Sequence, residues 1–219
     1  MQRLISALTV AAVALSSIVA VPLARAAAPL TALPKAGDEA LRVCILARLA
    51  GMDPDSPTDT FAATADVTWF VMERARNEPT SGYVEAINSG LSKLRLDDAR
   101  EIMAQAAVLN PLCAKRWPAS QRAMKVKLPS DSFDRPGICL SYASLLQGMA
   151  QAGKEPVMLA ETRRIIDWNQ KSLSDAVLAK HGFGGDDGSV RALAGWLRAG
   201  HALGNPASIV AACGALVPR

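Results

Sequence analysis

Four cysteines constrain this chain more than any other feature of its sequence. They are Cys44, Cys113, Cys139 and Cys213, and none of them forms a C-x-x-C pair. The lack of such a pair argues against a thioredoxin-like redox site and against the usual spacing of zinc ligands. In an exported protein an even number of cysteines indicates disulfide bonds, so the role of these cysteines depends on the compartment of the protein.

The first 26 residues have the organisation of a secretory signal peptide. Arg3 forms a short positive region, an uncharged apolar run covers residues 4–23, and residues 24–26 have the small-x-small pattern of a cleavage site. An uncleaved membrane anchor is the alternative, because about twenty apolar residues can span a bilayer. We expect a cleaved signal peptide, a secreted and specifically periplasmic location, and no transmembrane segment in the mature chain.

Loss of this segment changes what the charge and composition imply. The whole chain carries +4, and removal of Arg3 and Arg25 lowers the charge to +2. So small an excess of positive charge does not favour nucleic acid as a partner. Half of the residues are hydrophobic, which excludes a disordered chain. With only two histidines in the sequence, we expect no metal site and no cofactor.

The chain repeats itself loosely, and the repeat predicts how the cysteines pair. A tryptophan follows the first cysteine of one copy by 25 residues and that of the other by 29, and the second cysteine of each copy begins a C-x4-P pattern. Of the three possible connectivities, this duplication favours Cys44–Cys113 and Cys139–Cys213. Each bridge would close a loop of about seventy residues, which is worth roughly 4 kcal/mol in the chain-entropy model.

Helix signals recur along the mature chain, and alternating patterns bounded by hairpin turns are absent. Ser56 is a good N-cap before Pro57, and apolar residues follow at helical spacing. We expect an all-α fold of two tandem antiparallel helical units, each closed by a disulfide, as a pseudo-duplicated helical bundle. The expected organisation is a signal peptide (1–26), a flexible N-terminus (27–36), helical unit 1 (37–118), a basic linker (119–135) and helical unit 2 (136–219).

Four helix boundaries are expected at particular residues, and one of them is the start of the last helix at Pro206. The helix with Asp98 in its first turn is expected to be interrupted at Pro111, because proline removes a backbone donor. Pro156 is expected to begin a long helix, with continuation through Val177 as the longer alternative. Ser189 is expected to cap the helix that follows.

The segment between the two units is basic and rich in proline. Its candidate residues are Lys115, Arg116, Trp117, Arg122, Lys125 and Lys127. One interpretation is a solvated linker. The other is a patch for an anionic surface, a glycan or an acidic envelope protein, with Trp117 as its aromatic anchor.

Trp69 and Trp168 occupy matching places in the two copies. They could be core residues, or they could be aromatic walls of a ligand groove between the units. Arg74, Arg163 and Arg164 lie close to them in the sequence and could make such a groove suitable for an anion.

No catalytic signature is present: the chain has no G-x-S-x-G, H-E-x-x-H or Rossmann glycine pattern. The glycine-rich residues 182–189 lack the Lys-Ser/Thr ending of a P-loop, so we interpret them as a flexible loop with acidic capping residues. We therefore assign no catalytic residue, and the leading hypothesis is a binding or scaffold protein of unknown specific role.

Two other functions remain open. A hydrolase could use His201 or His181 with Asp186 or Asp187, and it requires one histidine in a concave pocket within hydrogen-bond reach of a carboxylate or hydroxyl. A periplasmic chaperone or inhibitor requires a contiguous exposed apolar patch.

Overall fold

The computed structural model describes residues 30–50, 56–90, 92–122 and 125–218. The expected signal peptide, residues 1–26, lies outside the described residues. Within them, ten α-helices and two 3-10 helices occur without any strand, which confirms the all-α fold class. In this part of the chain no helix is both long and apolar enough to cross a bilayer.

The helices divide into two halves along the chain. The first half holds α2 (Gly37–Leu49), α3 (Pro57–Arg74), η2 (Ala75–Asn77), α4 (Thr80–Gly90), α5 (Ala99–Ala104), α6 (Ala106–Arg116) and η3 (Pro118–Ser120). The second half holds α7 (Asp134–Gly153), α8 (Pro156–Gln170), α9 (Asp175–Lys180), α10 (Gly188–Leu203) and α11 (Pro206–Gly214).

Both expected disulfides are present. Cys44 of α2 is bonded to Cys113 of α6, and Cys139 of α7 is bonded to Cys213 of α11. All four cysteines are buried, so each bridge ties the first helix of a half to its last helix inside the core. The pairing is confirmed, whereas the duplication that suggested it stays a prediction.

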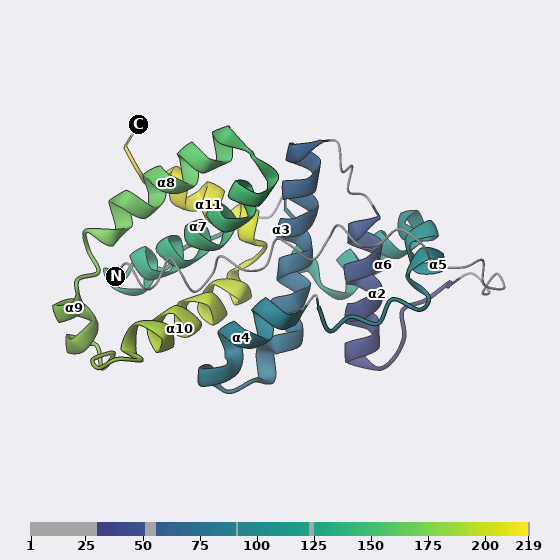
Figure 1. The fold of residues 1–219 in the computed structure, drawn as a ribbon, viewed down its shortest axis with the longest axis horizontal. Coiled ribbons are helices and arrows are strands. Elements are labelled where there is room, and N and C mark those ends of the chain that lie inside the picture. The colour runs from purple at the N-terminus through teal and green to yellow at the C-terminus, as the bar shows by residue number, and fades with distance from the viewer. Residues whose placement is uncertain (1–29, 51–55, 91, 123–124, 219) are drawn as a thin grey trace.

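Helix α3 joins the two halves. It packs against α2 and α4 of the first half and against α7, α10 and α11 of the second. Figure 1 shows α3 standing between the group α2, α5 and α6 and the group α7 to α11. The buried side chains form one cluster that includes residues of both halves. The two disulfide-closed halves therefore share a hydrophobic core.

The packing of α10 against α7 depends on a glycine. A Cβ atom at Gly200 would collide with the ring of Tyr142, so only glycine permits this approach. The fully buried Tyr142 donates its hydroxyl to the Leu197 carbonyl at 2.8 Å, and its oxygen lies 3.9 Å from the sulfur of Met72 on α3. One tyrosine of α7 thus contacts both α10 and α3.

The helix starts expected at Ser56 and Pro206 are confirmed. The Ser56 hydroxyl accepts the Asp59 backbone N–H at 3.3 Å, with Pro57 as the first residue of α3. Pro206 begins α11, where the Asn205 side chain accepts the Ala207 N–H at 2.9 Å. These caps depend on neighbouring residues only, which is why the sequence predicts them well.

The expected interruption at Pro111 is wrong. The helix breaks earlier, at Gln105, and Pro111 lies inside α6. A proline at this position deprives the carbonyl of Ala107 of its helical donor. Because Ala107 is exposed, water can satisfy that carbonyl, and the cost to the helix stays small.

In the second half the expected helix start at Pro156 is confirmed, whereas the longer alternative for that helix and the expected cap at Ser189 are wrong. Helix α8 ends at Gln170, and the Ser174 side chain accepts the Val177 N–H at 3.3 Å to begin the separate helix α9. Ser189 lies within α10 and not before it, and Asp187 occupies the N-cap position. The carboxylate of Asp187 pairs with Arg191 at 3.2 Å, one helical turn further on.

Removal of either disulfide should lower stability by about 4 kcal/mol, because each bridge limits the freedom of an unfolded loop of about seventy residues. The variants are Cys44→Ala/Cys113→Ala and Cys139→Ala/Cys213→Ala, and urea unfolding followed by circular dichroism measures the loss. Because α3 packs against both halves, we expect one cooperative transition in each variant. Two separate transitions would show that the halves unfold independently.

Candidate functional site

A cavity of about 360 Å³ lies where α3, α4, α10 and the end of α6 meet. We call it the Trp69 cavity. Its wall includes Trp69, Glu73, Tyr83, Trp117, Arg198 and His201. The first four residues come from the first half of the chain, and the last two come from α10 in the second half. The cavity therefore exists only because the two halves pack together.

Three side chains of this wall carry a buried nitrogen atom that has no hydrogen-bond partner among the described residues. The atoms are Trp69 Nε1, Arg198 Nε and His201 Nε2. The side chains of Trp69 and His201 are almost completely enclosed, with 3% and 6% exposure. An unsatisfied buried donor or acceptor costs about 1–3 kcal/mol, so such atoms are rare and usually need an explanation. Each of these three atoms has less than 1 Å² of accessible surface, so a ligand in the cavity cannot reach it in this arrangement of side chains.

His201 stacks on Trp69, with ring centroids 4.6 Å apart. Its Nε2 lies 3.5 Å from a carboxylate oxygen of Glu73, which is too long for a strong charge-assisted hydrogen bond. Burial lowers the pKa of His201 to about 4, although hydrogen bonding with the Trp69 backbone partly opposes this effect. The imidazole is therefore neutral at pH 7.

Glu73 occupies the same wall, one helical turn after Trp69. Burial raises the pKa of this carboxyl group, and the neighbouring Arg76 opposes the rise. Arg76 Nη1 lies 3.3 Å from Glu73 Oε1, so these two opposite charges are paired.

Arg198 covers the ring of Tyr83, with its guanidinium carbon 4.4 Å from the ring centroid. Its two terminal nitrogens donate to the Glu78 carbonyl and to the Thr80 hydroxyl. Burial raises the pKa of Tyr83, so the phenol beneath this cation stays neutral. No carboxylate among the described residues pairs with Arg198.

Arg116 has a similar arrangement on the other side of the cavity. Its guanidinium carbon lies 4.7 Å from the Trp117 ring centroid. The terminal nitrogens donate to the carbonyls of Pro34 at 2.7 Å and Lys35 at 3.4 Å. Arg116 also has no carboxylate partner in the part of the chain that the structure describes.

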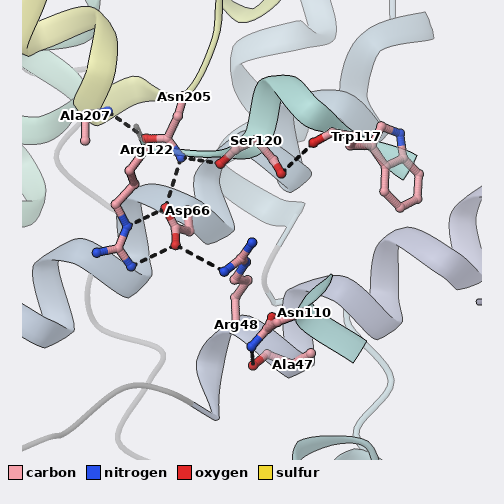
Figure 2. Close-up of polar contacts among 9 residues, drawn as sticks. All are labelled: Ala47, Arg48, Asp66, Asn110, Trp117, Ser120, Arg122, Asn205 and Ala207. Carbon is pink, nitrogen blue, oxygen red and sulfur yellow. Dashed lines mark hydrogen bonds and ion pairs between the residues drawn. The ribbon is translucent and has the colours of Figure 1, made fainter. Parts of the chain in front are cut away.

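A buried carboxylate next to this cavity fixes the position of one of its walls. Asp66 of α3 is 2% exposed, and Figure 2 shows Arg48, Arg122 and Asn205 converging on it. Arg122 binds both carboxylate oxygens at 2.8 Å, Asn205 donates at 3.0 Å, and Arg48 lies at 3.9 Å. These contacts bring together α2, α3, the segment after η3 and the start of α11. We call this group, with Ser120, the Asp66 junction.

The Asp66 junction continues into the wall of the cavity. Asn205 also donates to the Ser120 carbonyl at 2.8 Å, and the Ser120 hydroxyl donates to the Trp117 carbonyl at 2.7 Å. Figure 2 shows the Trp117 indole on the far side of Ser120 from Asp66. Gly204, with φ +152°, gives the chain the backbone conformation that precedes Asn205. The junction thus positions η3 and also Trp117, which directly precedes η3 and lines the cavity.

The structure separates the members of the predicted basic patch. Its three lysines are exposed. Arg122 is paired with Asp66, whereas Arg116 and Trp117 line the Trp69 cavity. Ser120 and Arg122 of this segment contact Asn205 and Asp66, so the segment is attached to both halves of the core at these two residues.

The structure does not bring the predicted groove residues together. Trp69 is buried in the cavity wall, whereas Trp168 is 46% exposed on α8. Arg164 donates to backbone carbonyls at the C-terminal end of α11, where positive charge is favourable. Arg163 is exposed on α8 and Arg74 is partly buried at the end of α3, and neither lines the Trp69 cavity.

The two histidines have different surroundings. His201 and Asp187 lie at opposite ends of α10, about 20 Å apart at 1.5 Å per residue. The carboxylate beside His201 is therefore Glu73. His181 is exposed at the end of α9 and stacks on Phe133 at 3.8 Å.

Exposed large apolar side chains are distributed over several elements of the described structure. They are Leu96, Val108, Val157, Trp168, Val190 and Leu216. In the described part of the chain, no three His, Cys, Asp or Glu side chains are grouped to hold a metal ion.

Sequence reasoning missed Glu73, Tyr83 and Arg198 as site residues, and it missed Asp66 altogether. The signal for Asp66 was a carboxylate in the middle of an apolar helix, between Ala65 and Val67.

Comparison of the chain with protein-family models, with curated proteins and with solved structures found no match. We therefore infer function from the chemistry of the cavity.

Removal of Arg122, the cation closest to Asp66 in the Asp66 junction, should lower the stability of the fold. We expect Arg122→Met to lower the free energy of unfolding by about 3 kcal/mol, because Asp66 stays buried with only Asn205 and the more distant Arg48. Urea unfolding measures the loss. The matched control is Arg191→Met, which removes an exposed ion pair with Asp187 and should cost less than about 1 kcal/mol. Equal, small losses in the two variants would contradict the role given to the junction.

Protonation of His201 should destabilise the fold. Its pKa is about 4 in the folded protein and 6.5 in an unfolded chain, so unfolding takes up a proton between these values. Relative to His201→Gln, the wild type should lose about 3 kcal/mol of stability as the pH falls from 7 to 4. Urea unfolding at each pH measures the difference. The variant itself is the control, and a wild type whose stability follows that of His201→Gln at every pH would contradict the burial of a neutral imidazole.

Proposed function

We propose that this chain is a secreted or periplasmic binding protein, and that the Trp69 cavity holds a small ligand without transforming it. Two disulfides are typical of proteins in oxidising compartments and support this location. The cavity of about 360 Å³ falls within the usual range of small-molecule sites. The observation that carries the proposal is that two arginines of this wall, Arg116 and Arg198, have no carboxylate partner among the described residues.

Binding is favoured over hydrolysis because the described wall of the cavity contains no serine, threonine or cysteine. A covalent mechanism needs such a nucleophile within hydrogen-bond reach of its base. Hydrolysis by an activated water is the second candidate, since His201 and Glu73 lie 3.5 Å apart in this cavity. The distribution of the exposed apolar side chains gives less support to a chaperone or inhibitor.

A fragment screen of the disulfide-bonded protein tests the proposal. Ligand-observed NMR with anionic, neutral and cationic fragments should detect at least one binder, and calorimetry should then give its Kd. Arg116→Gln and Arg198→Gln should each weaken the binding of an anionic fragment at least tenfold, because each removes a cation from the cavity wall. Recovery of the unchanged ligand after incubation supports binding, whereas turnover that His201→Gln abolishes supports the hydrolase.

Two control variants lie outside the cavity. Arg191→Gln changes an arginine on the same helix as Arg198, and Trp168→Phe changes the exposed tryptophan of α8. Both should leave Kd within twofold of the wild-type value. Loss of binding in Trp168→Phe would instead favour the groove between Trp69 and Trp168. A screen in which no fragment binds would overturn the proposal.

A further inference from the structure

A groove of about 580 Å³ lies between α7 and α8 and shares no lining residue with the Trp69 cavity. We call it the α7–α8 groove. Its polar side chains come from both helices and have no net charge: they are Gln147, Gln151, Arg163, Asp167 and Gln170. None of the five side chains has a hydrogen bond or an ion pair within the described part of the chain. All five are exposed or partly buried, so their polar atoms are available to a ligand.

The positions of these side chains follow from helix geometry. Only Lys154 and Glu155 separate the two helices, and Lys154 has the left-handed conformation, φ 55°, that often ends a helix. Helices joined by so short a connection run antiparallel and side by side (Figure 1), so Gln147 lies across the groove from the turn of α8 that carries Arg163. Arg163 and Asp167 are one turn apart on α8, about 6 Å along its axis at 1.5 Å per residue.

The two charges of the groove are opposite and yet unpaired. Ion pairs between residues three or four apart in the described structure all have the acid first: Glu39–Arg42, Glu73–Arg76, Glu161–Arg164 and Asp187–Arg191. Arg163 precedes Asp167, which is the less favourable order for a pair one turn apart. Lys171, one turn after Asp167, lies instead over the Trp168 ring, 5.8 Å from its centroid. Arg163 and Asp167 therefore remain available for charges that a ligand brings.

The rest of the lining suits a peptide group and a small apolar side chain. A glutamine amide both donates and accepts hydrogen bonds, as a peptide group does, and the groove contains three of them. Leu159 and the buried Ile166 add an apolar surface to the same groove. A neutral sugar could use the amides, but it would leave Arg163 and Asp167 without partners of opposite charge.

We propose that the α7–α8 groove binds a short peptide with free termini, of about dipeptide length. The terminal carboxylate accepts from Arg163, the terminal ammonium donates to Asp167, and the peptide group bonds with the glutamine amides. Two extended residues span about 7 Å, which matches the spacing of about 6 Å between the two charged residues along α8. The volume of the groove lies within the usual range of small-molecule sites. This site is independent of the function proposed for the Trp69 cavity.

Four related probes test the matching of charges by calorimetry at pH 7. They are alanyl-leucine, N-acetyl-alanyl-leucine without the ammonium, alanyl-leucinamide without the carboxylate, and ε-aminocaproate, which keeps both charges but has no peptide group. Alanyl-leucine should bind at least tenfold more tightly than each of the other three. Binding of any of these three as tight as that of alanyl-leucine would overturn the proposal.

Two variants each remove one charge of the groove. Arg163→Gln should weaken alanyl-leucine at least tenfold and leave alanyl-leucinamide unchanged, since that probe has no carboxylate. Asp167→Asn should weaken alanyl-leucine at least tenfold and leave N-acetyl-alanyl-leucine unchanged, since that probe has no ammonium. Both side chains are exposed and unpaired, so neither variant should lose stability. The matched controls, Arg191→Gln and Asp187→Asn, break an ion pair of α10 and should not change the binding of any probe.

One further variant separates this site from the Trp69 cavity. Arg116→Gln removes a cation of that cavity and should leave the binding of alanyl-leucine unchanged. If Arg116→Gln abolishes the binding and Arg163→Gln does not, the peptide occupies the Trp69 cavity and the proposal for the α7–α8 groove is wrong. Absence of binding by alanyl-leucine also overturns the proposal, and the function proposed for the Trp69 cavity is then unaffected.

Discussion

A carboxylate inside a protein is stable only where cations and hydrogen-bond donors surround it, and the helices of this chain are arranged so that Asp66 is surrounded. Arg48 approaches from α2, Arg122 from the segment after η3, and Asn205 from the start of α11. Apolar contacts alone would allow helices to slide past one another. The directional contacts of Asp66 remove this freedom, because they are satisfied in one arrangement of α3, the connecting segment and the second half.

The Trp69 cavity is a consequence of that arrangement. Its wall takes Trp69 and Glu73 from α3 and Arg198 and His201 from α10, so the site is formed only when the two halves are correctly placed. Hydrogen bonds from Asn205 to Ser120 and from Ser120 to Trp117 link the Asp66 junction to the wall of the cavity. The same junction that orders the fold therefore also orders the site.

The features that sequence reasoning predicted well depend on few residues close together, or on covalent bonds. The cap at Ser56, the start of α11 at Pro206 and the buried apolar face of α3 follow from local spacing. Boundaries that depend on competition between neighbouring structures were harder to predict. Pro111 is tolerated inside α6 because the carbonyl it leaves without a donor is exposed, which helical periodicity does not show.

By itself the sequence determined the helical class and the two disulfide pairs, because periodicity and cysteine spacing are properties of the chain. Only the tertiary structure decided which side chains meet. It placed Trp69 beside His201 and left Trp168 exposed, although each follows the first cysteine of its half by a similar number of residues. It also showed that Asp66, 56 residues away from Arg122, is the partner of that cation. Such contacts between distant residues depend on how helices pack in three dimensions, and one sequence contains no direct record of that packing.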